Sequence, residues 1–167
     1  MEKEPRQIIF RMPEKKDAQT IWSLIKLSPP LDINSLYCYL LICTHFSGTS
    51  IVAESPQGLC GFISAYICPN QQNTLFVWQV VVGKDYRGEG IAKEMLARLL
   101  RRKYQAPIRY LETTVNPSNV SSSALFYSTA RLLNTSCMES VLFSEEDFGG
   151  EAHEDEILYR IGPFDML

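Results

Sequence analysis

The stretch VVVGKDYRGEGIAKEMLARLL, from Val80 to Leu100, constrains the fold more than any other part of the sequence. It passes from β-branched residues through a glycine-containing turn into apolar residues at helical spacing. Gly88 and Gly90 allow a sharp turn in which no Cβ blocks a ligand. The first amides of the following helix and its dipole then favour an anion, and Arg87 adds a charged donor. The stretch therefore predicts a strand, an anion-binding turn suited to a pyrophosphate, and a helix.

Two familiar phosphate motifs do not match this turn. A Walker motif needs a lysine followed by serine or threonine after its second glycine, and neither is present. A dinucleotide-binding turn needs a third glycine, but Lys93 occupies that position. A turn with two glycines is common in proteins, so taken alone it could also be purely structural.

The rest of the chain alternates between strand and helix patterns. The predicted elements, in order, are a strand at Gln7–Met12, a helix ending near Leu27, a helix capped by Asn34 or Ser35 with Leu36, Leu40 and Cys43 on one face, strands at Ser50–Glu54, Leu59–Ile67 and Asn73–Val82, a helix from Ile91, a strand at Arg109–Val115, a helix marked by Ala124, Leu125 and Leu132, and strands at Ser140–Phe143 and Glu156–Ile161. This order predicts an α/β fold with a mixed central sheet and helices on both faces.

Composition narrows the functional classes. The 167 residues fit one domain spanning 1–167, and a formal charge of −3 argues against a nucleic-acid partner. Five cysteines without a CxxC pair, in a chain with only two histidines, indicate reduced, mostly buried thiols and no metal site. The sequence shows neither a signal-peptide pattern at MEKEPRQIIFRM nor an apolar run long enough for a membrane span. We therefore expect a cytoplasmic protein without a membrane partner.

The glycine turn resembles the acyl-CoA signature of the GNAT superfamily of N-acetyltransferases, Arg/Gln-x-x-Gly-x-Gly/Ala, which Arg87, Gly90 and Ala92 fill here. The resemblance covers essentially the whole chain and implies a GNAT fold with acetyl-CoA as co-substrate. Gly83 departs from the proline that the family often has there. The resemblance implies coenzyme contacts from the strand before the turn, the turn itself and the next helix, at Val80, Val82, Arg87, Gly88, Glu89, Gly90, Ile91, Ala92, Asn119 and Phe126. Asn119 could instead serve only as a helix cap.

Three segments are similar to the diaminobutyrate acetyltransferases within that superfamily. They are SPPLDINSLYCYLLICTHF, FVWQVVV and NPSNVSSSALF. This resemblance implies acetyl transfer from acetyl-CoA to the 4-amino nitrogen of L-2,4-diaminobutyrate, which supplies the precursor of ectoine, a compatible solute. The alternatives are a GNAT enzyme for another small amine or a polyamine, and a non-catalytic acyl-CoA-binding module.

A small diamino acid brings ammonium groups and a carboxylate, so its pocket needs acidic groups. Asp32, in the loop entering the second helix, is the first candidate to bind an ammonium, or else it caps that helix. Tyr37 could close the pocket or belong to the core. Trp78 could wall the methylene chain or serve as a core aromatic. The acidic run HEDEILY is of a kind that usually forms a solvated loop, but Glu156 opens a strand there and is the second candidate to bind an ammonium, while His153 is either a base or a surface residue.

Transfer requires a neutral amine, although an alkyl ammonium has a pKa of about 10. Glu156, Asp32 or His153 could take that proton, and the backbone N–H near Val80 could stabilise the oxyanion. Many GNAT enzymes protonate the thiolate with a tyrosine, but Phe126 stands at that position and Tyr127 follows one residue later. We therefore interpret Tyr127 as structural. Exposed final strands in this fold often pair, which predicts a homodimer.

Overall fold

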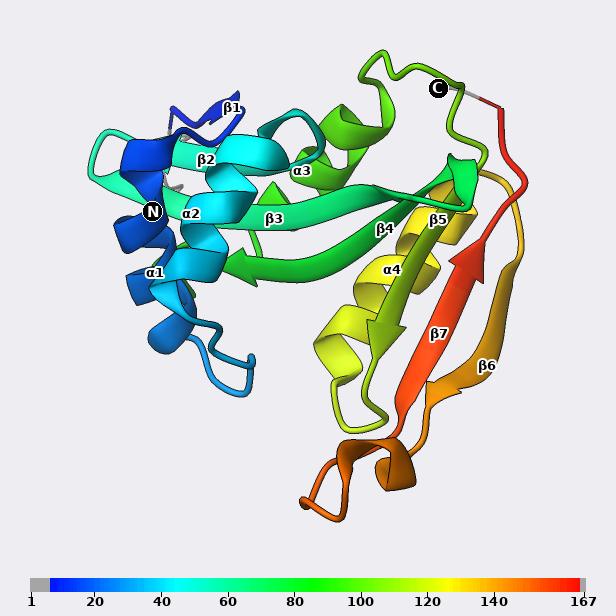
Figure 1. Cartoon of the computed structure of the whole chain (residues 1–167). Helices are drawn as coiled ribbons and strands as arrows, with labels where there is room; N and C mark the ends of the chain where they lie inside the picture. The colour runs from blue at the N-terminus through cyan, green and yellow to red at the C-terminus, as the bar shows by residue number, and fades with distance from the viewer. Residues whose placement is uncertain (1–6, 166–167) are drawn as a thin grey trace. The chain divides into compact units, whose positions relative to one another are not determined.

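The computed structural model describes residues 7–165 of the chain (Figure 1). The helices are α1 (Ala18–Lys26), α2 (Leu36–His45), α3 (Ile91–Leu100) and α4 (Val120–Leu132), and the strands are β1 (Ile9–Arg11), β2 (Ile51–Ser55), β3 (Gly58–Cys68), β4 (Gln71–Val82), β5 (Tyr110–Val115), β6 (Cys137–Phe143) and β7 (Glu156–Ile161). The strand order is β1-β2-β3-β4-β5-β7-β6. Strands β4 and β5 are parallel, whereas the β1–β2, β2–β3, β5–β7 and β6–β7 pairs are antiparallel. The predicted mixed α/β sheet is confirmed.

The chain forms two compact units that divide within β3 and β4. The first unit comprises the chain up to Tyr66 together with Gln79–Leu99, and the second comprises Ile67–Trp78 together with the chain from Leu100. The single domain over 1–167 stays a prediction, and its ends at 1–6 and 166–167, which include the first half of the stretch MEKEPRQIIFRM, lie outside the described residues.

In the first unit, helices cover both faces of the strands because neighbouring strand residues point to opposite sides. Val52 pairs with Phe62, and both belong to the core that α1 and α2 form over one face. The next pair, Ala53 and Gly61, points the other way. A Cβ added to Gly61 would lie 3.0 Å from Met95 Cε of α3. Helix α3 therefore packs closely on the opposite face from α1 and α2.

An ion network ties β1 to the start of α1. Arg11 donates from Nη1 and Nη2 to the two carboxylate oxygens of Asp17, at 2.7 and 3.0 Å, and from Nε to Glu54 at 2.8 Å. Asp17 is 5% exposed and also accepts the Glu14 amide. Burial alone would raise the pKa of Asp17, but the hydrogen bonds from Arg11 and the Glu14 amide outweigh it and hold that pKa below its ordinary value.

Replacing Asp17 with asparagine should lower the free energy of unfolding at pH 7 by about 2 kcal/mol, because the Arg11 charge loses its partner. The folded pKa lies below the unfolded one, so this contribution is complete above about pH 4 and is lost as the pH falls through the folded pKa. Urea denaturation at pH 7 and pH 3 measures both values. Glu94→Gln, which removes an exposed pair with Arg98, is the control and should cost less than about 0.5 kcal/mol. An undiminished Asp17→Asn effect at pH 3 would contradict this account.

In the second unit, β7 lies between β5 and β6 and contacts α4. The hydroxyls of Ser123 on α4 and Tyr159 on β7 are 3.1 Å apart, and the rings of Tyr127 and Tyr159 pack with centroids at 5.4 Å. The buried residues of α4 are Phe126, Thr129 and Ala130. This places α4 on one face of the β5–β7–β6 ladder, as the ribbon in Figure 1 shows.

Gly162 follows β7 in a backbone conformation that only glycine adopts readily. Its φ is +137°, and a Cβ there would lie 2.5 Å from the Arg109 carbonyl oxygen. Gly162→Ala should therefore lower the free energy of unfolding by about 3 kcal/mol or more, through backbone strain and overlap. Thermal unfolding measures this loss. Gly48→Ala is the control, since a Cβ at Gly48 meets nothing within 4 Å. Equal melting temperatures for the two variants would contradict the prediction.

The predicted helices α2 and α4 both form, but the predicted apolar face of α2 was wrong. On α2 the buried residues are Tyr39, Ile42 and Cys43, while Leu36 is 38% exposed and Leu40 is only partly buried. The helix is apolar on almost every side, so periodicity does not select a face. On α4, Ala124 and Leu132 are exposed, because the helix buries the face that carries Phe126 instead.

The thiols are less buried than predicted. All five cysteines are free, but only Cys43 and Cys60 are buried, and Cys38, Cys68 and Cys137 are partly exposed. Burial raises the pKa of Cys43 to about 11, which keeps that thiol protonated. Within residues 7–165, no helix is both long and apolar enough to cross a membrane.

Candidate functional site

The turn between β4 and α3 has the geometry of an anion site. Gly88 and Gly90 have φ angles of +80° and +77°, and a Cβ on either would meet no neighbour within 4 Å. The first intrahelical bond runs from Glu94 N to the Gly90 carbonyl, at 3.0 Å. The amides of Ile91, Ala92 and Lys93 precede that bond and have no acceptor within the helix. The open turn therefore carries a row of helix N-terminal donors, as the sequence predicted.

Arg87 and Tyr86 fix the position of this turn. Arg87 donates from Nε to the Val82 carbonyl at 3.1 Å, so its stem lies along the end of β4. The Tyr86 hydroxyl lies 2.8 Å from Ser55 Oγ and donates to Gln57 at 3.2 Å, which ties the turn to the β2–β3 hairpin. These contacts reduce the freedom of a glycine-containing segment before any ligand binds.

Gly83 also has a structural reason to differ from the proline that its family often has at this position. Its amide donates to the Cys60 carbonyl at 2.8 Å, extending the contact between β3 and the end of β4. Proline has no amide hydrogen and would lose this bond. The departure therefore preserves the position of the strand end rather than disturbing the turn.

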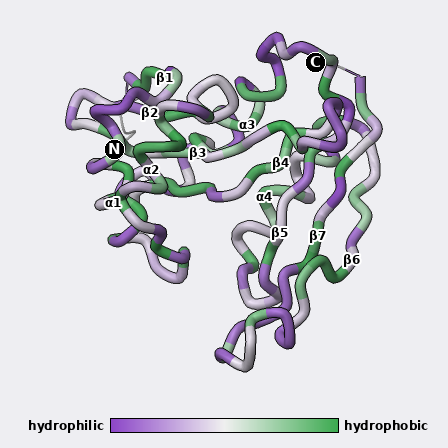
Figure 2. Tube along the Cα trace, in the orientation of Figure 1, coloured by the Kyte–Doolittle hydropathy of each residue, from purple (hydrophilic) through white to green (hydrophobic). Residues whose placement is uncertain are grey.

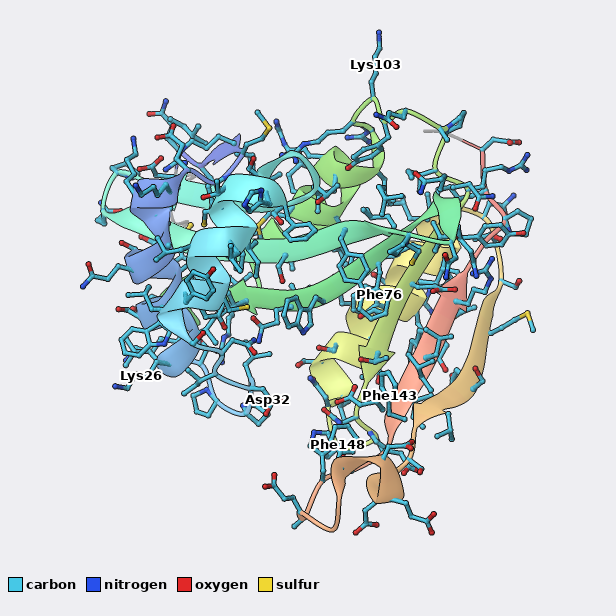
Figure 3. The ribbon with its side chains drawn as sticks, in the orientation of Figure 1. Lys26, Asp32, Phe76, Lys103, Phe143 and Phe148 are labelled. Carbon is cyan, nitrogen blue, oxygen red and sulfur yellow. The ribbon has the colours of Figure 1, made fainter. Side chains whose placement is uncertain are left out.

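Asp32 lies in the loop that joins α1 to α2, also in the first unit (Figure 3). Its side chain is not the cap of α2, because Ser35 occupies the N-cap and accepts the Cys38 amide at 3.2 Å. Asp32 is exposed, and Tyr37 in the first turn of α2 is 68% exposed. Tyr37 is therefore not a core aromatic, and both side chains stand at the surface of this unit.

The backbone of the Asp32 loop is held by two buried side chains. Gln79 of β4, 6% exposed, donates from Nε2 to the Asp32 carbonyl at 2.7 Å. Tyr39, fully buried, donates its hydroxyl to Gln79 Oε1 at 3.0 Å and accepts the Asn34 amide at 3.4 Å. The sequence reasoning missed Gln79 and Tyr39. A glutamine inside the apolar run FVWQVVV was the available signal, because a buried polar side chain needs partners.

In the second unit, Glu156 opens β7 within a cluster of polar side chains. Glu156 Oε1 accepts from Asn116 Nδ2 at 3.0 Å and lies 3.8 Å from His153 Nε2. The side chains of Glu156 and His153 are 16% and 24% exposed. The His153 ring stacks on Phe148, with centroids 3.7 Å apart and planes at 13°. His153 is therefore a held, partly buried ring beside a carboxylate, and the surface interpretation does not describe it.

The two acidic residues directly before Glu156 also accept hydrogen bonds within the second unit. Glu154 accepts the Ser118 amide and hydroxyl, at 3.1 and 2.9 Å, and Asp155 accepts the Glu145 amide at 2.8 Å. The loop is hydrophilic along most of its length (Figure 2), yet these bonds give it a defined path. Among the three consecutive acids, Glu156 is the one whose carboxylate meets the side chains of Asn116 and His153. Asn116, in the NPSN turn, is a further residue that the sequence reasoning missed.

The remaining candidates in the second unit occupy different environments. Trp78 follows the last registered β4–β5 pair, Val77 with Thr113, and is 46% exposed, so it is not a core residue. Asn119 caps α4 by accepting the Ser122 amide at 3.2 Å. Phe126 is 2% exposed in the core of the unit. The coenzyme contacts assigned to Asn119 and Phe126 stay predictions.

No group of three or more histidine, cysteine or acidic side chains that could hold a metal ion occurs among the residues that the structure describes.

Comparisons with known proteins agree on one family. The sequence pattern of the Acetyltransferase (GNAT) family matches residues 18–128. A protein named L-2,4-diaminobutyric acid acetyltransferase from Virgibacillus pantothenticus is 48% identical over 152 residues, covering 91% of this chain and 96% of that protein. A protein of the same name from Bordetella parapertussis is 44% identical over 156 residues, covering 93% of this chain and 84% of that protein.

A solved structure is similar over nearly the whole length. It is diaminobutyrate acetyltransferase EctA from Paenibacillus lautus, in complex with its substrate L-2,4-diaminobutyric acid and coenzyme A. The TM-score is 0.92 at 42% sequence identity, and the match covers 96% of this chain and 97% of that one.

Proposed function

This chain belongs to the GNAT family of acetyltransferases, and from that premise we propose that it transfers the acetyl group of acetyl-CoA to the 4-amino nitrogen of L-2,4-diaminobutyrate. The product, N4-acetyl-L-2,4-diaminobutyrate, serves ectoine biosynthesis. The observation that carries this conclusion is the similarity to a structure that holds both diaminobutyric acid and coenzyme A. Acetyl-CoA is the co-substrate.

The experiment that tests the substrate is release of the coenzyme A thiol from acetyl-CoA in the presence of single amines. The amines are L-2,4-diaminobutyrate, ornithine, lysine, spermidine and a short peptide. We expect the highest kcat/KM with diaminobutyrate, because a pocket built for a short diamino acid loses contacts with every longer chain. Higher kcat/KM with any other amine would reject this substrate while leaving the family intact.

For the coenzyme, we propose that the β4–α3 turn binds the pyrophosphate. The amides from Gly88 to Ala92 supply the donors, and the N-terminal end of α3 supplies favourable potential. Arg87 uses Nε on the Val82 carbonyl, which leaves its Nη groups for an anion. A carbonyl has two lone pairs, so Val82 can still accept from the pantetheine arm, and Val80 offers the neighbouring backbone groups on the same side.

For the amino acid, we propose that Asp32 binds one ammonium group and Glu156 receives the reacting amine. Asp32 is an exposed carboxylate on a loop whose backbone is fixed, and Glu156 is a partly buried carboxylate held by Asn116. Tyr37 in the first unit and Trp78 in the second are large, exposed aromatic side chains, and each is a proposed contact for the methylene groups of the substrate.

The proposed reaction requires the amine to lose a proton before it attacks. Glu156 accepts that proton, and His153, 3.8 Å away and stacked on Phe148, is placed to take it onward. The neutral amine nitrogen then forms a bond to the thioester carbon, and the negative charge moves to the carbonyl oxygen, where a backbone N–H near Val80 is the proposed donor. When the tetrahedral intermediate collapses, the carbon–sulfur bond breaks, the thiolate leaves, and the nitrogen, which became cationic in the attack, releases its second proton to give the neutral amide.

We do not assign a side-chain acid to the thiolate. Tyr127 packs on Tyr159 and is 40% exposed, which supports its structural role on α4. A thiol is a much stronger acid than an alkyl ammonium, so solvent or the proton released by the amine can protonate the thiolate. The step therefore balances without a dedicated acid.

We further propose a homodimer formed through β6. This strand ends the sheet order, and Met138, Val141, Leu142 and Phe143 on it are between 41% and 68% exposed. An apolar edge strand is a strong template for another strand, and a two-fold axis would pair β6 with its copy. Val141→Lys should shift the mass measured by light scattering from two chains to one. Leu27→Lys, at a 78% exposed position on the first unit, should leave the dimer intact. A monomeric wild type would reject the proposal.

We also propose that the protein has no nucleic-acid partner and works in the cytoplasm. A formal charge of −3 makes a nucleic-acid partner unfavourable. Five free cysteines support a reducing, cytoplasmic environment.

A further inference from the structure

We infer that Gln79, together with Tyr39, is a positioning residue that sets the affinity for the amino-acid substrate by fixing the loop of Asp32. This inference rests on the proposed role of Asp32 in binding an ammonium group. All the residues involved belong to the first unit.

The loop between α1 and α2 is anchored at both ends and at its centre. At its start the Ser28 amide donates to the Ile25 carbonyl at 2.9 Å, and at its end Ser35 caps α2. Between these points, the Asp32 carbonyl accepts from Gln79 Nε2 at 2.7 Å. This is the shortest hydrogen bond of the network, and it holds the residue whose carboxylate is proposed to meet the ligand.

Gln79 is itself held rigidly enough to act as an anchor. Its backbone amide donates to Ser64 Oγ at 3.1 Å, and its side-chain Oε1 accepts a hydrogen bond from the Tyr39 hydroxyl at 3.0 Å. Ser64 and Tyr39 are 1% and 0% exposed, and the Tyr39 ring packs edge-on against Phe62. The Oε1 contact also fixes the orientation of the amide group, because only Nε2 can then donate to the Asp32 carbonyl.

Burying the polar side chain of Gln79 costs free energy, and packing alone gives no reason for a glutamine at this position. Methionine or leucine would fill the same space on β4 without a polar group to satisfy. Leu31 packs on the core, but the next two residues, Asp32 and Ile33, are both exposed, and the side-chain amide of Gln79 reaches the backbone at Asp32. We therefore infer that the hydrogen bonds of Gln79 serve to place the Asp32 backbone and not to stabilise the core.

The test compares Gln79→Met with Tyr39→Phe in steady-state kinetics. Gln79→Met removes both side-chain bonds and should raise KM for diaminobutyrate about tenfold, with KM for acetyl-CoA within about twofold. Tyr39→Phe keeps the ring and removes only the hydroxyl, so it should raise the same KM by about threefold. Gln72→Met, an exposed glutamine at the start of β4, is the matched control and should change neither constant.

A double-mutant cycle separates positioning from a general loss of structure. If Gln79 acts through the Asp32 carboxylate, Gln79→Met should have little further effect on KM for diaminobutyrate in an Asp32→Asn background. Full additivity, or an equal rise in KM for both substrates, would overturn the inference. A wild-type protein that is inactive on diaminobutyrate would instead overturn the proposed function, so the two failures are distinguishable. If Gln79→Met does not fold, Tyr39→Phe carries the same cycle.

Discussion

Replacing Glu156 with glutamine is expected to lower kcat for diaminobutyrate acetylation by about 100-fold or more. Glutamine keeps the shape of the side chain and can still accept the bond from Asn116, but it cannot take a proton from the amine. The expected loss therefore falls on the chemical step. Steady-state kinetics at saturating acetyl-CoA measure this loss, and circular dichroism checks that the variant is folded.

The matched control is Glu154→Gln, two residues earlier in the same loop. Glu154 accepts hydrogen bonds from the amide and hydroxyl of Ser118, so its carboxylate stabilises the loop. In Glu154→Gln, kcat should stay within about threefold of the wild-type value. If Glu154→Gln lowers kcat as much as Glu156→Gln, the loop conformation is the cause and Glu156 is not the proton acceptor. Full activity of Glu156→Gln would contradict the proposed mechanism directly.

The second large effect is expected at Asp32. Asp32→Asn removes one charge while leaving the backbone carbonyl that Gln79 binds, and it should raise KM for diaminobutyrate about 10- to 100-fold. The physical reason is the loss of a charge-assisted bond to an ammonium group. KM for acetyl-CoA should change by less than about twofold, because the pyrophosphate donors lie in a different segment of the first unit.

Asp165→Asn serves as the control for the loss of a negative charge, since its side chain is 96% exposed. Screening by 0.5 M salt should not reproduce the Asp32→Asn phenotype if the contact is a direct one. An unchanged KM for diaminobutyrate in Asp32→Asn would remove Asp32 from the proposed binding site and leave Glu156 as the remaining candidate.

The element order and the anion turn could be predicted because both depend on local chemistry. Gly88 and Gly90 have positive φ angles, the residues SPQG at 55–58 form the turn between β2 and β3, and Pro29 and Pro30 follow the end of α1. Each of these signals acts over a few residues, so tertiary packing had little opportunity to override it. The GNAT fold was expected from the resemblance of this turn to the acyl-CoA signature of the superfamily, with which the element order agrees.

Side-chain roles set by long-range contacts could not be predicted in the same way. Glu156 was singled out from the sequence, but its hydrogen bond with Asn116, 40 residues earlier in the chain, could not be predicted. The role of Gln79 depends on a loop 47 residues away. The buried face of α2 could not be chosen from LYCYLLIC, because apolar residues occur on all sides and only packing against Phe62 and its neighbours selects Tyr39.

The central claim is acetyl transfer to one particular nitrogen of diaminobutyrate, and the position of the acetyl group in the product tests it most directly. The purified protein would be incubated with acetyl-CoA and L-2,4-diaminobutyrate, and the product would be assigned by two-dimensional proton–carbon NMR. The account predicts an amide correlation to the 4-methylene carbon. An acetyl group on the 2-amino nitrogen, or an even mixture of both products, would contradict it.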